Sequence, residues 1–239
     1  MVQNFYTQNI DEIELGKFKK LATQWWDLNG PCRTLHHLNL ARVQFINSQI
    51  NLCGKCILDI GSGGGILSEK LCTEGAHVIG IDASSEIIAV AKNHLNLSKL
   101  AIKYKHTTAE QYAMQHDKTF DIITCMELLE HVPDTSSLVK ACTKLVKPNG
   151  LIFFSMLNRS LVSYFIAIIG AEYILELVPK QTHDYQKFLQ LAELNDILVE
   201  QHLSLQAITG VRYNPITHRA ILHPKISVNY LVCVKQNVI

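Results

Sequence analysis

Residues 56–66 read CILDIGSGGGI, and this stretch decides how the rest of the chain is expected to fold. Its first half, Cys56–Ile60, is apolar and of strand length, and a glycine-rich turn follows it directly. Gly61, Gly63 and Gly65 can adopt backbone conformations that other residues avoid, and they let a ligand come close to the main chain. The stretch therefore predicts a buried strand, a ligand-binding turn and the start of a helix.

The segments on either side of this stretch alternate between strand-like and helical patterns. Apolar runs of strand length occur at His77–Asp82, Ala101–Lys105, Phe120–Cys125 and Leu151–Ser155, and helical patterns occur at Ile66–Thr73, Glu86–Leu97 and Ser136–Val146. This alternation is typical of a parallel α/β sheet with helices on both faces. Two further strand-like runs, Leu203–Ile208 and Ile226–Val234, follow, and the second is expected to close the sheet as an antiparallel strand.

The N-terminal part of the chain has a helical pattern and is expected to cover the ligand cleft. Ile13, Phe18, Leu21 and Trp25 recur at roughly helical spacing, and residues 35–50 repeat the pattern. The chain is therefore interpreted as a single domain of 239 residues. Its parts are an N-terminal helical cover at 1–52, a ligand-binding core at 53–156, and substrate- or membrane-facing helices with sheet-closing strands at 157–239.

Composition argues against several classes of function for this chain. The 22 Lys and Arg residues nearly balance the 21 Asp and Glu residues, so there is no strong overall charge to attract nucleic acid. Because the sequence shows no secretory leader and no apolar run of spanning length, we expect a cytoplasmic protein. The seven cysteines are odd in number and scattered, which favours reduced thiols over a disulfide framework.

Charged residues near the glycine turn separate the two classes of nucleotide ligand that use such a turn. The dinucleotide fingerprint needs Gly or Ala at its sixth position, where this chain has Ile66. Asp59 would repel a pyrophosphate, but it suits the ammonium and sulfonium groups of S-adenosylmethionine. Asp82 ends the second strand, where an acidic residue can accept hydrogen bonds from both ribose hydroxyls, although a helix N-cap is a competing interpretation. These residues favour S-adenosylmethionine over NAD.

A second polar group follows the fourth predicted strand. Residues 124–134 read TCMELLEHVPD, and open α/β sheets bind ligands outside the carboxyl ends of their strands. On one helical turn, Glu127, Glu130 and His131 would share a face. Such a set can hold a divalent cation, or it can orient His131 as a general base for a phenolic hydroxyl. Simple bracing of the turn is the competing interpretation.

Two apolar features stay open at this point. The segment 161–179 is more apolar than a surface helix needs, but Glu172 and Glu176 leave it too short to span a bilayer. It either lies at a membrane interface or over an apolar substrate as a lid, or it packs on the core. Trp25 and Trp26 either line an aromatic pocket or pack between helices.

Longer motifs resemble the ubiquinone biosynthesis O-methyltransferase family, and the likeness extends over nearly the whole chain. They include Trp25-Trp26-Asp27-Leu28, Thr124-Cys125-Met126-Glu127, Glu130-His131-Val132-Pro133-Asp134, Gly170-Ala171-Glu172-Tyr173, Thr182-His183-Asp184, Tyr213-Asn214-Pro215-Ile216-Thr217 and Val228-Asn229-Tyr230. The resemblance implies a class I methyltransferase with a Rossmann-like, mostly parallel, seven-stranded sheet. It also implies methyl transfer from S-adenosylmethionine to catechol-type hydroxyls of polyprenylated ubiquinone precursors, namely 2-polyprenyl-6-hydroxyphenol and 3-demethylubiquinol.

The resemblance also assigns roles to individual positions. The family's cofactor-contacting positions fall on Arg42, Gly61, Asp82 and Met126, and the positions proposed for a divalent ion such as magnesium fall on Glu127, Glu130 and His131. The expected partners are a polyprenylated phenol or quinol, the inner face of a membrane contacted through 161–179, and other enzymes of the same pathway. The alternatives are another small-molecule methyltransferase, such as a carbon-directed one, an NAD-dependent oxidoreductase, and a non-catalytic scaffold.

Three turn positions depart from the family pattern. Ser62 stands where the family usually has Cys, and both Asn149 and Gln181 stand where it has Gly. Asn tolerates a positive φ and Gln does not, so the last two test whether these turns need left-handed backbone.

Overall fold

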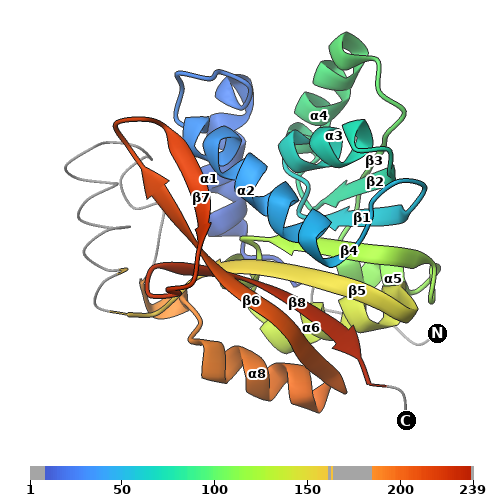
Figure 1. Ribbon diagram of the computed structural model, residues 1–239. Coiled ribbons are helices and arrows are strands. Elements are labelled where there is room, and N and C mark those ends of the chain that lie inside the picture. The colour runs from blue at the N-terminus through green and yellow to red at the C-terminus, as the bar shows by residue number, and fades with distance from the viewer. Residues whose placement is uncertain (1–8, 161–162, 164–184, 238–239) are drawn as a thin grey trace.

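The chain forms a twisted sheet with a parallel half and an antiparallel half (Figure 1). The computed structural model describes residues 9–160, 163 and 185–237. Within these ranges the sheet has eight strands, in the order β3-β2-β1-β4-β5-β8-β6-β7. Their bounds are β1 Cys56–Ile60, β2 His77–Asp82, β3 Lys103–His106, β4 Phe120–Met126, β5 Val146–Leu157, β6 Leu203–Asn214, β7 Arg219–His223 and β8 Asn229–Gln236.

The parallel half agrees with the alternating sequence pattern. β1 pairs in parallel with both β2 and β4, while β3 and β5 extend the sheet on either side. The predicted bounds of β1 and β2 are confirmed, whereas β3 begins two residues later than predicted, at Lys103. Because the chain runs outward from β1 to β3 and then returns to β4 on the other side, the strand order reverses between β1 and β4. Open α/β sheets bind their ligands at such a switch point, outside the carboxyl ends of the strands.

The sheet has one strand more than the seven that were expected, and this strand lies in the antiparallel half. The predicted antiparallel strand is confirmed as β8, which pairs with both β5 and β6. The additional strand is β7, which pairs with β6 over Gly210–Asn214, beyond the part of β6 that pairs with β8. The second half of β6 therefore finds a separate hydrogen-bonding partner. β7 was not predicted because the apolar run Leu203–Ile208 covers only the first half of β6.

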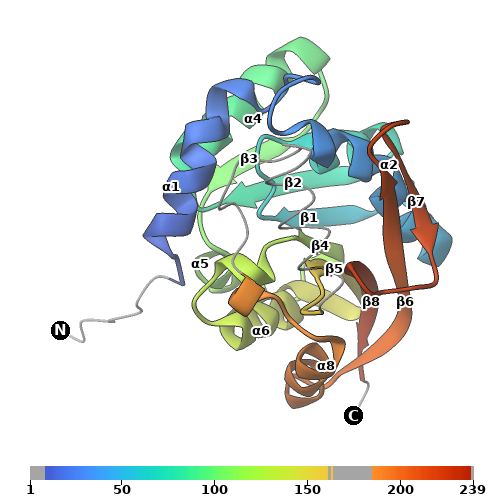
Figure 2. The same ribbon diagram turned by 90° about the vertical axis from the view of Figure 1, so that its left-hand side faces the viewer.

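Helices cover both faces of the sheet, as predicted (Figure 2). Side chains from α2, α3 and α4 form the core on one face, and those from α5, α6 and α8 form the core on the other. The helix bounds are α1 Glu12–Leu21, α2 Arg33–Gln49, α3 Ile66–Thr73, α4 Ser85–Ser98, α5 Ala109–Ala113, α6 Thr135–Leu145 and α8 Leu191–Glu200. Among the described helices, none is both long enough and apolar enough to cross a membrane.

The expected N-terminal helical cover is present, but the inner face of α1 differs from a simple apolar stripe. Phe18 and Leu21 pack against a small apolar cluster that includes Trp25, whereas Ile13 is 76% exposed. Glu14, which shares a helix face with Phe18 and Leu21, is instead only 5% exposed. A buried carboxylate on this face needs partners, and these lie in the candidate active site.

The backbone at Asn149, in the first part of β5, explains one departure from the family pattern. Asn149 has a φ of +65°, so this position does need left-handed backbone, and Asn is among the residues that tolerate it. Gln181 and nearly all of the apolar segment 161–179 lie outside the described residues, so the predictions for them stay predictions.

Candidate active site

The glycine turn lies at the carboxyl end of β1, and its shape depends on glycine at several positions. Gly61, Gly63 and Gly65 have φ values of +67°, +55° and +95°, a region that side-chain-bearing residues rarely adopt. A Cβ on Gly63 would come 2.5 Å from Trp25, and one on Gly65 would come 2.4 Å from the Tyr104 hydroxyl. The glycines therefore admit neighbouring protein side chains as well as leaving the backbone accessible from the cavity.

The two tryptophans pack on this turn. Trp25 is 7% exposed and lies against Gly63 and Gly64, where it also lines the cavity. Trp26 donates a hydrogen bond from Nε1 to the carbonyl oxygen of Gly64 at 2.9 Å and stacks on His94 with the ring centroids 3.4 Å apart. Both interpretations therefore hold in part. The two rings pack the N-terminal cover onto the turn, and Trp25 also lines the cavity.

Asp59 lies beneath the turn, where its charge is isolated from solvent. Its two carboxylate oxygens accept hydrogen bonds from the hydroxyls of Ser68 and Thr124, at 2.6 and 2.7 Å. Asp59 and Thr124 are register partners on β1 and β4, so their side chains leave the same face of the sheet. Burial raises the pKa of Asp59 to about 6. An approaching cation would stabilise the ionised form.

Asp82 ends β2 and organises the turn from the other side. Its Oδ2 accepts a hydrogen bond from the backbone N–H of Gly63 at 3.1 Å, and its Oδ1 accepts one from that of Ser84 at 2.8 Å. The N-cap of α4 is Ser84, so the competing interpretation of Asp82 as the N-cap is wrong. Burial raises the pKa of Asp82. Each carboxylate oxygen has a second lone pair that can accept a hydrogen bond from a ligand.

Glu127 does not share a helical turn with Glu130 and His131, so that prediction was wrong. Only Leu129–His131 forms a short 3-10 helix, and Glu127 precedes it with a left-handed φ of +51°. Its side chain turns toward α2 instead, where Oε1 accepts a hydrogen bond from Arg42 Nη2 at 2.5 Å. Because Glu127 has this left-handed backbone, its side chain points in a different direction from those of Glu130 and His131.

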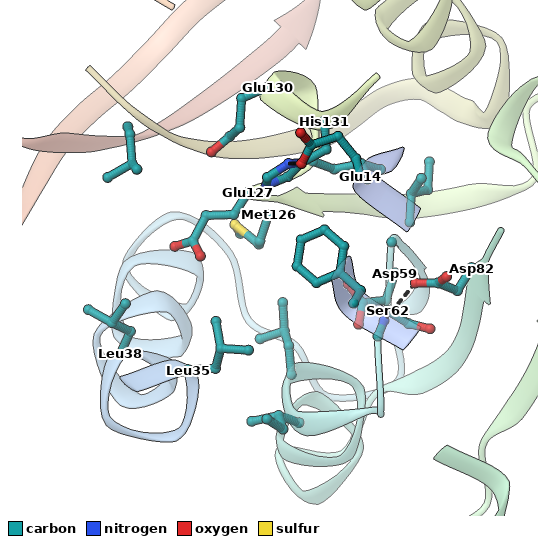
Figure 3. A pocket seen from close by; sticks show the side chains of 18 of the residues that line it. Glu14, Leu35, Leu38, Asp59, Ser62, Asp82, Met126, Glu127, Glu130 and His131 are labelled. Carbon is teal, nitrogen blue, oxygen red and sulfur yellow. Dashed lines mark hydrogen bonds and ion pairs between the residues drawn. The ribbon is translucent and has the colours of Figure 1, made fainter. Parts of the chain in front are cut away.

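His131 is held by a residue that sequence analysis did not identify. Its Nδ1 lies 3.0 Å from Oε2 of Glu14, 117 positions away in the sequence, and the ring of Phe18 packs edge-on at 5.0 Å. Figure 3 shows Glu14 and His131 side by side on one wall of the pocket. A sequence signal for Glu14 did exist, because it occupies the apolar face of α1 together with Phe18 and Leu21.

The remaining predicted residues lie nearby without forming a metal-binding cluster. Met126 ends β4 at 9% exposure and Glu130 is 5% exposed, and both line the same cavity. Among the described residues, no three His, Cys, Asp or Glu side chains are grouped so that they could hold a metal ion. As they stand, Glu127 faces Arg42 and His131 faces Glu14, so this arrangement does not fit a bound divalent ion.

A single cavity of about 730 Å³ is lined by every predicted site residue except Gly65. It extends from the glycine turn and Asp82, past Thr107–Glu110 at the end of β3, to His131 and the apolar side chains of α1 and α2. Carboxyl groups outnumber Lys and Arg side chains in its lining. The carboxyl groups belong to Asp11, Glu14, Asp59, Asp82, Glu110, Glu127 and Glu130, and the Lys and Arg residues are Arg42, Arg212 and Lys225. Such a lining suits a cationic nucleoside and opposes a pyrophosphate.

Comparisons with known proteins identify the fold and the family of this chain. Residues 58–154 match the family model of a methyltransferase domain. Magnesium protoporphyrin IX methyltransferase from Synechocystis PCC 6803, in a crystal structure with bound SAH, superposes with a TM-score of 0.70 over 95% of this chain and 97% of that one, at 17% identity. A SAM-dependent methyltransferase from Thermotoga maritima gives a TM-score of 0.66 over 94% and 100%, at 15% identity. At such identities the likeness shows the fold alone.

The matched domain and relatives over nearly the full length make this chain an S-adenosylmethionine-dependent methyltransferase with a Rossmann-like fold. The ubiquinone biosynthesis O-methyltransferase of Thiobacillus denitrificans is 46% identical over 228 residues, covering 95% of this chain and 98% of that protein. The enzyme of the same name from Aromatoleum aromaticum is 47% identical over 230 residues, covering 96% and 98%. The chain therefore belongs to the ubiquinone biosynthesis O-methyltransferase family.

Proposed function

We propose that the protein methylates a phenolic hydroxyl of polyprenylated ubiquinone precursors, 2-polyprenyl-6-hydroxyphenol and 3-demethylubiquinol. One observation carries this proposal: a single cavity places the glycine turn, the imidazole of His131 and an apolar wall within reach of one another. A charged methyl donor and an apolar acceptor need such a shared space. The names of the relatives support ubiquinone biosynthesis as the pathway.

The turn and the strand ends are proposed to hold S-adenosylmethionine, which supplies a methyl group already activated by a positively charged sulfur. Gly61 and Gly63 leave the backbone open to the ligand, and Gly65 keeps the turn in shape above Tyr104. Asp82 would accept hydrogen bonds from ribose hydroxyls, and Asp59 would contribute negative charge from below. Arg42 and Met126 would complete the site from α2 and the end of β4.

His131 is proposed to remove the proton of the acceptor hydroxyl. An unperturbed phenol has a pKa of about 10, so at neutral pH it needs a base to become a strong nucleophile. The proton would pass from the hydroxyl oxygen to a ring nitrogen of His131. The resulting phenolate would attack the donor's methyl carbon in line, the carbon–sulfur bond would break, and S-adenosylhomocysteine would leave with the electron pair. The protein's main task is then to align acceptor and donor. Apolar side chains such as Leu35 and Leu38 would hold the acceptor next to His131.

A divalent ion at Glu127, Glu130 and His131 stays a separate proposal. The present directions of Glu127 and His131 do not favour it, so no step of the reaction is assigned to a metal. A chelator distinguishes the two routes, since a reaction that depends on His131 alone should be insensitive to it.

A peripheral contact with the inner face of a membrane through 161–179, together with association with other pathway enzymes, is proposed from the sequence and the apolar substrate. Liposome flotation tests the membrane contact. Wild-type protein should float, and the double variant Phe165→Glu, Ile169→Glu should not. Equal flotation of the two proteins would rule out this segment as the contact.

Transfer of isotope-labelled methyl from S-adenosylmethionine to a short-chain prenyl catechol tests the proposed reaction. We expect label on oxygen with the catechol and no label with a matched quinone that lacks the hydroxyl. Label on carbon would instead show a carbon-directed enzyme. Calorimetric titration with S-adenosylmethionine and with NAD should show heat only for the former, and binding of NAD alone would refute the proposed donor site.

A further inference from the structure

The N-terminal helix α1 contributes a buried carboxylate to the active site. Glu14 is 5% exposed and lines the cavity, whereas its neighbours Glu12 and Ile13 are exposed. Its Oε2 lies 3.0 Å from Nδ1 of His131. Its Oε1 accepts hydrogen bonds from the ammonium groups of Lys17 and Lys187, at 3.0 and 3.1 Å.

These contacts keep Glu14 ionised and fix its position. The two ammonium groups stabilise the carboxylate form of Glu14 through direct ion pairs. Lys187 also bonds to Asp11, whose side chain caps the start of α1. A carboxylate that is ionised and held in this way accepts hydrogen bonds and donates none.

The start of α1 is anchored independently of Glu14. The side chain of Asn9 exchanges two 2.8 Å hydrogen bonds with the backbone of Asp134, three residues after His131, and donates a third, also 2.8 Å, to Glu110 in the first turn of α5. Phe18, one helical turn beyond Glu14, packs edge-on against the His131 ring. The relation between α1 and His131 is therefore defined by contacts on both sides of Glu14.

An acceptor-only partner at Nδ1 determines how the imidazole of His131 carries its proton. In a neutral imidazole one nitrogen donates and the other accepts. With Glu14 at Nδ1, the proton belongs on Nδ1, and the lone pair belongs on Nε2. We infer that Glu14 is a positioning residue that sets the tautomer and ring orientation of His131, so that Nε2 is the nitrogen that serves the reaction. This inference rests on the role proposed above for His131.

Nitrogen-15 NMR of histidine-labelled protein, recorded at alkaline pH where imidazoles are neutral, tests the inference without substrate or cofactor. The His131 signals are assigned by their absence in His131→Gln. In the wild type we expect the Nδ1–H form to dominate. In Glu14→Leu, which lacks any acceptor, the His131 signals should shift to the Nε2–H form, which free histidine favours. Glu12→Leu, an exposed change one residue from the N-cap, is the matched control and should leave them unchanged.

Kinetics with the same variants separates this inference from the proposed function. Glu14→Leu should lower kcat about 10- to 100-fold, the usual effect of removing a carboxylate that orients a functional histidine, with little change in the Kd for S-adenosylmethionine. Glu14→Gln, a smaller change that keeps a carbonyl acceptor, should lose less. An unaltered His131 tautomer in both Glu14 variants would overturn the inference. An altered tautomer with unchanged kcat would uphold the positioning and refute His131 as the base.

Discussion

The two ends of the cavity are built in opposite ways. At the donor end, Gly61, Gly63 and Gly65 follow one strand and Asp82 ends the next, so the main features lie within 27 consecutive residues, 56–82. At the acceptor end, His131 depends on Glu14 from 117 positions away, and the Arg42–Glu127 pair, 85 positions apart, links this end to the donor site. The difference teaches that a local sequence motif can specify the donor site, whereas the acceptor site exists only after the N-terminal helices have packed.

The largest expected effect is on catalysis at the acceptor end. His131→Ala should lower kcat by about 100- to 10,000-fold, the usual contribution of a positioned general base, while the Kd for S-adenosylmethionine stays nearly constant. Methyl-transfer kinetics and calorimetry measure the two quantities. The control His77→Ala, at the exposed start of β2, should change neither. Equal losses of kcat and of donor affinity would show that His131 only braces the site. The two ends would then not differ in their roles.

The next effect concerns stability at the donor end. Gly63→Ala should lower the free energy of unfolding by about 2–5 kcal/mol. Alanine disfavours the left-handed backbone that this position has, and its Cβ would collide with Trp25. Gly54→Ala is a matched control, since Gly54 has a φ of +73° but no atom within 4 Å of an added Cβ, so it should show only the backbone part, about 1–2 kcal/mol. Urea unfolding measures both variants, and equal losses would mean that Trp25 readily moves aside.

A third prediction concerns the pH dependence of stability beneath the turn. Burial raises the pKa of Asp59 from 3.8 to about 6, so the folded protein binds this proton more tightly than the unfolded chain does. The stability from Asp59 is therefore complete below about pH 4 and is lost as the pH rises through 6, by about 3 kcal/mol in all. Unfolding free energies of wild type and Asp59→Asn, compared at pH 4 and pH 7, should diverge by this amount in favour of the variant.

Asp121 provides a control of opposite sign for this titration. Despite partial burial, the hydrogen bond from Lys147 lowers the pKa of Asp121. The stability from this group is lost as the pH falls below about 4, so Asp121→Asn should lose stability relative to wild type as the pH rises toward 4 and should show almost no further change between pH 4 and pH 7. If the Asp59→Asn comparison moved in that same direction, the carboxyl of Asp59 would be ionised in the folded protein across the whole range.

The smallest expected effect is the coupling between Arg42 and Glu127. A double-mutant cycle with Arg42→Met and Glu127→Gln should give an interaction energy of about 1–2 kcal/mol, because Arg42 is buried while Glu127 remains one-third exposed. The same cycle on Glu12 and Lys20, two exposed residues more than two turns apart on α1, should give none. A coupling near zero for Arg42 and Glu127 would mean that this long-range contact does not hold the acceptor end together.

Much of the fold could be predicted from sequence because it depends on local patterns. The runs at Cys56–Ile60, His77–Asp82 and Ile66–Thr73 have the bounds that the structure shows, since periodicity and glycine punctuation mark them directly. β7 was missed because it pairs with the second half of β6, which the apolar run Leu203–Ile208 does not include. The donor site could be predicted for the same reason as the strands.

The acceptor site could be predicted only as a set of residues. Glu127, Glu130 and His131 were correctly located in one cavity, but a common helical face required regular φ angles from 127 onward. A glutamate at +51° breaks that regularity, and no sequence pattern announces a left-handed glutamate. Glu14 carried a signal in its placement among apolar residues, yet its partner His131 could not be inferred without the packing of α1.

The packing of the tryptophans has a practical consequence for spectroscopy. The chain contains two tryptophans, and both lie on the glycine turn, one buried against Gly63 and the other bonded to Gly64. Intrinsic fluorescence excited at long ultraviolet wavelengths therefore reports on the donor end, where both rings pack. A quenching or colour shift upon adding a nucleoside would mark occupancy of that end without any label or engineered probe.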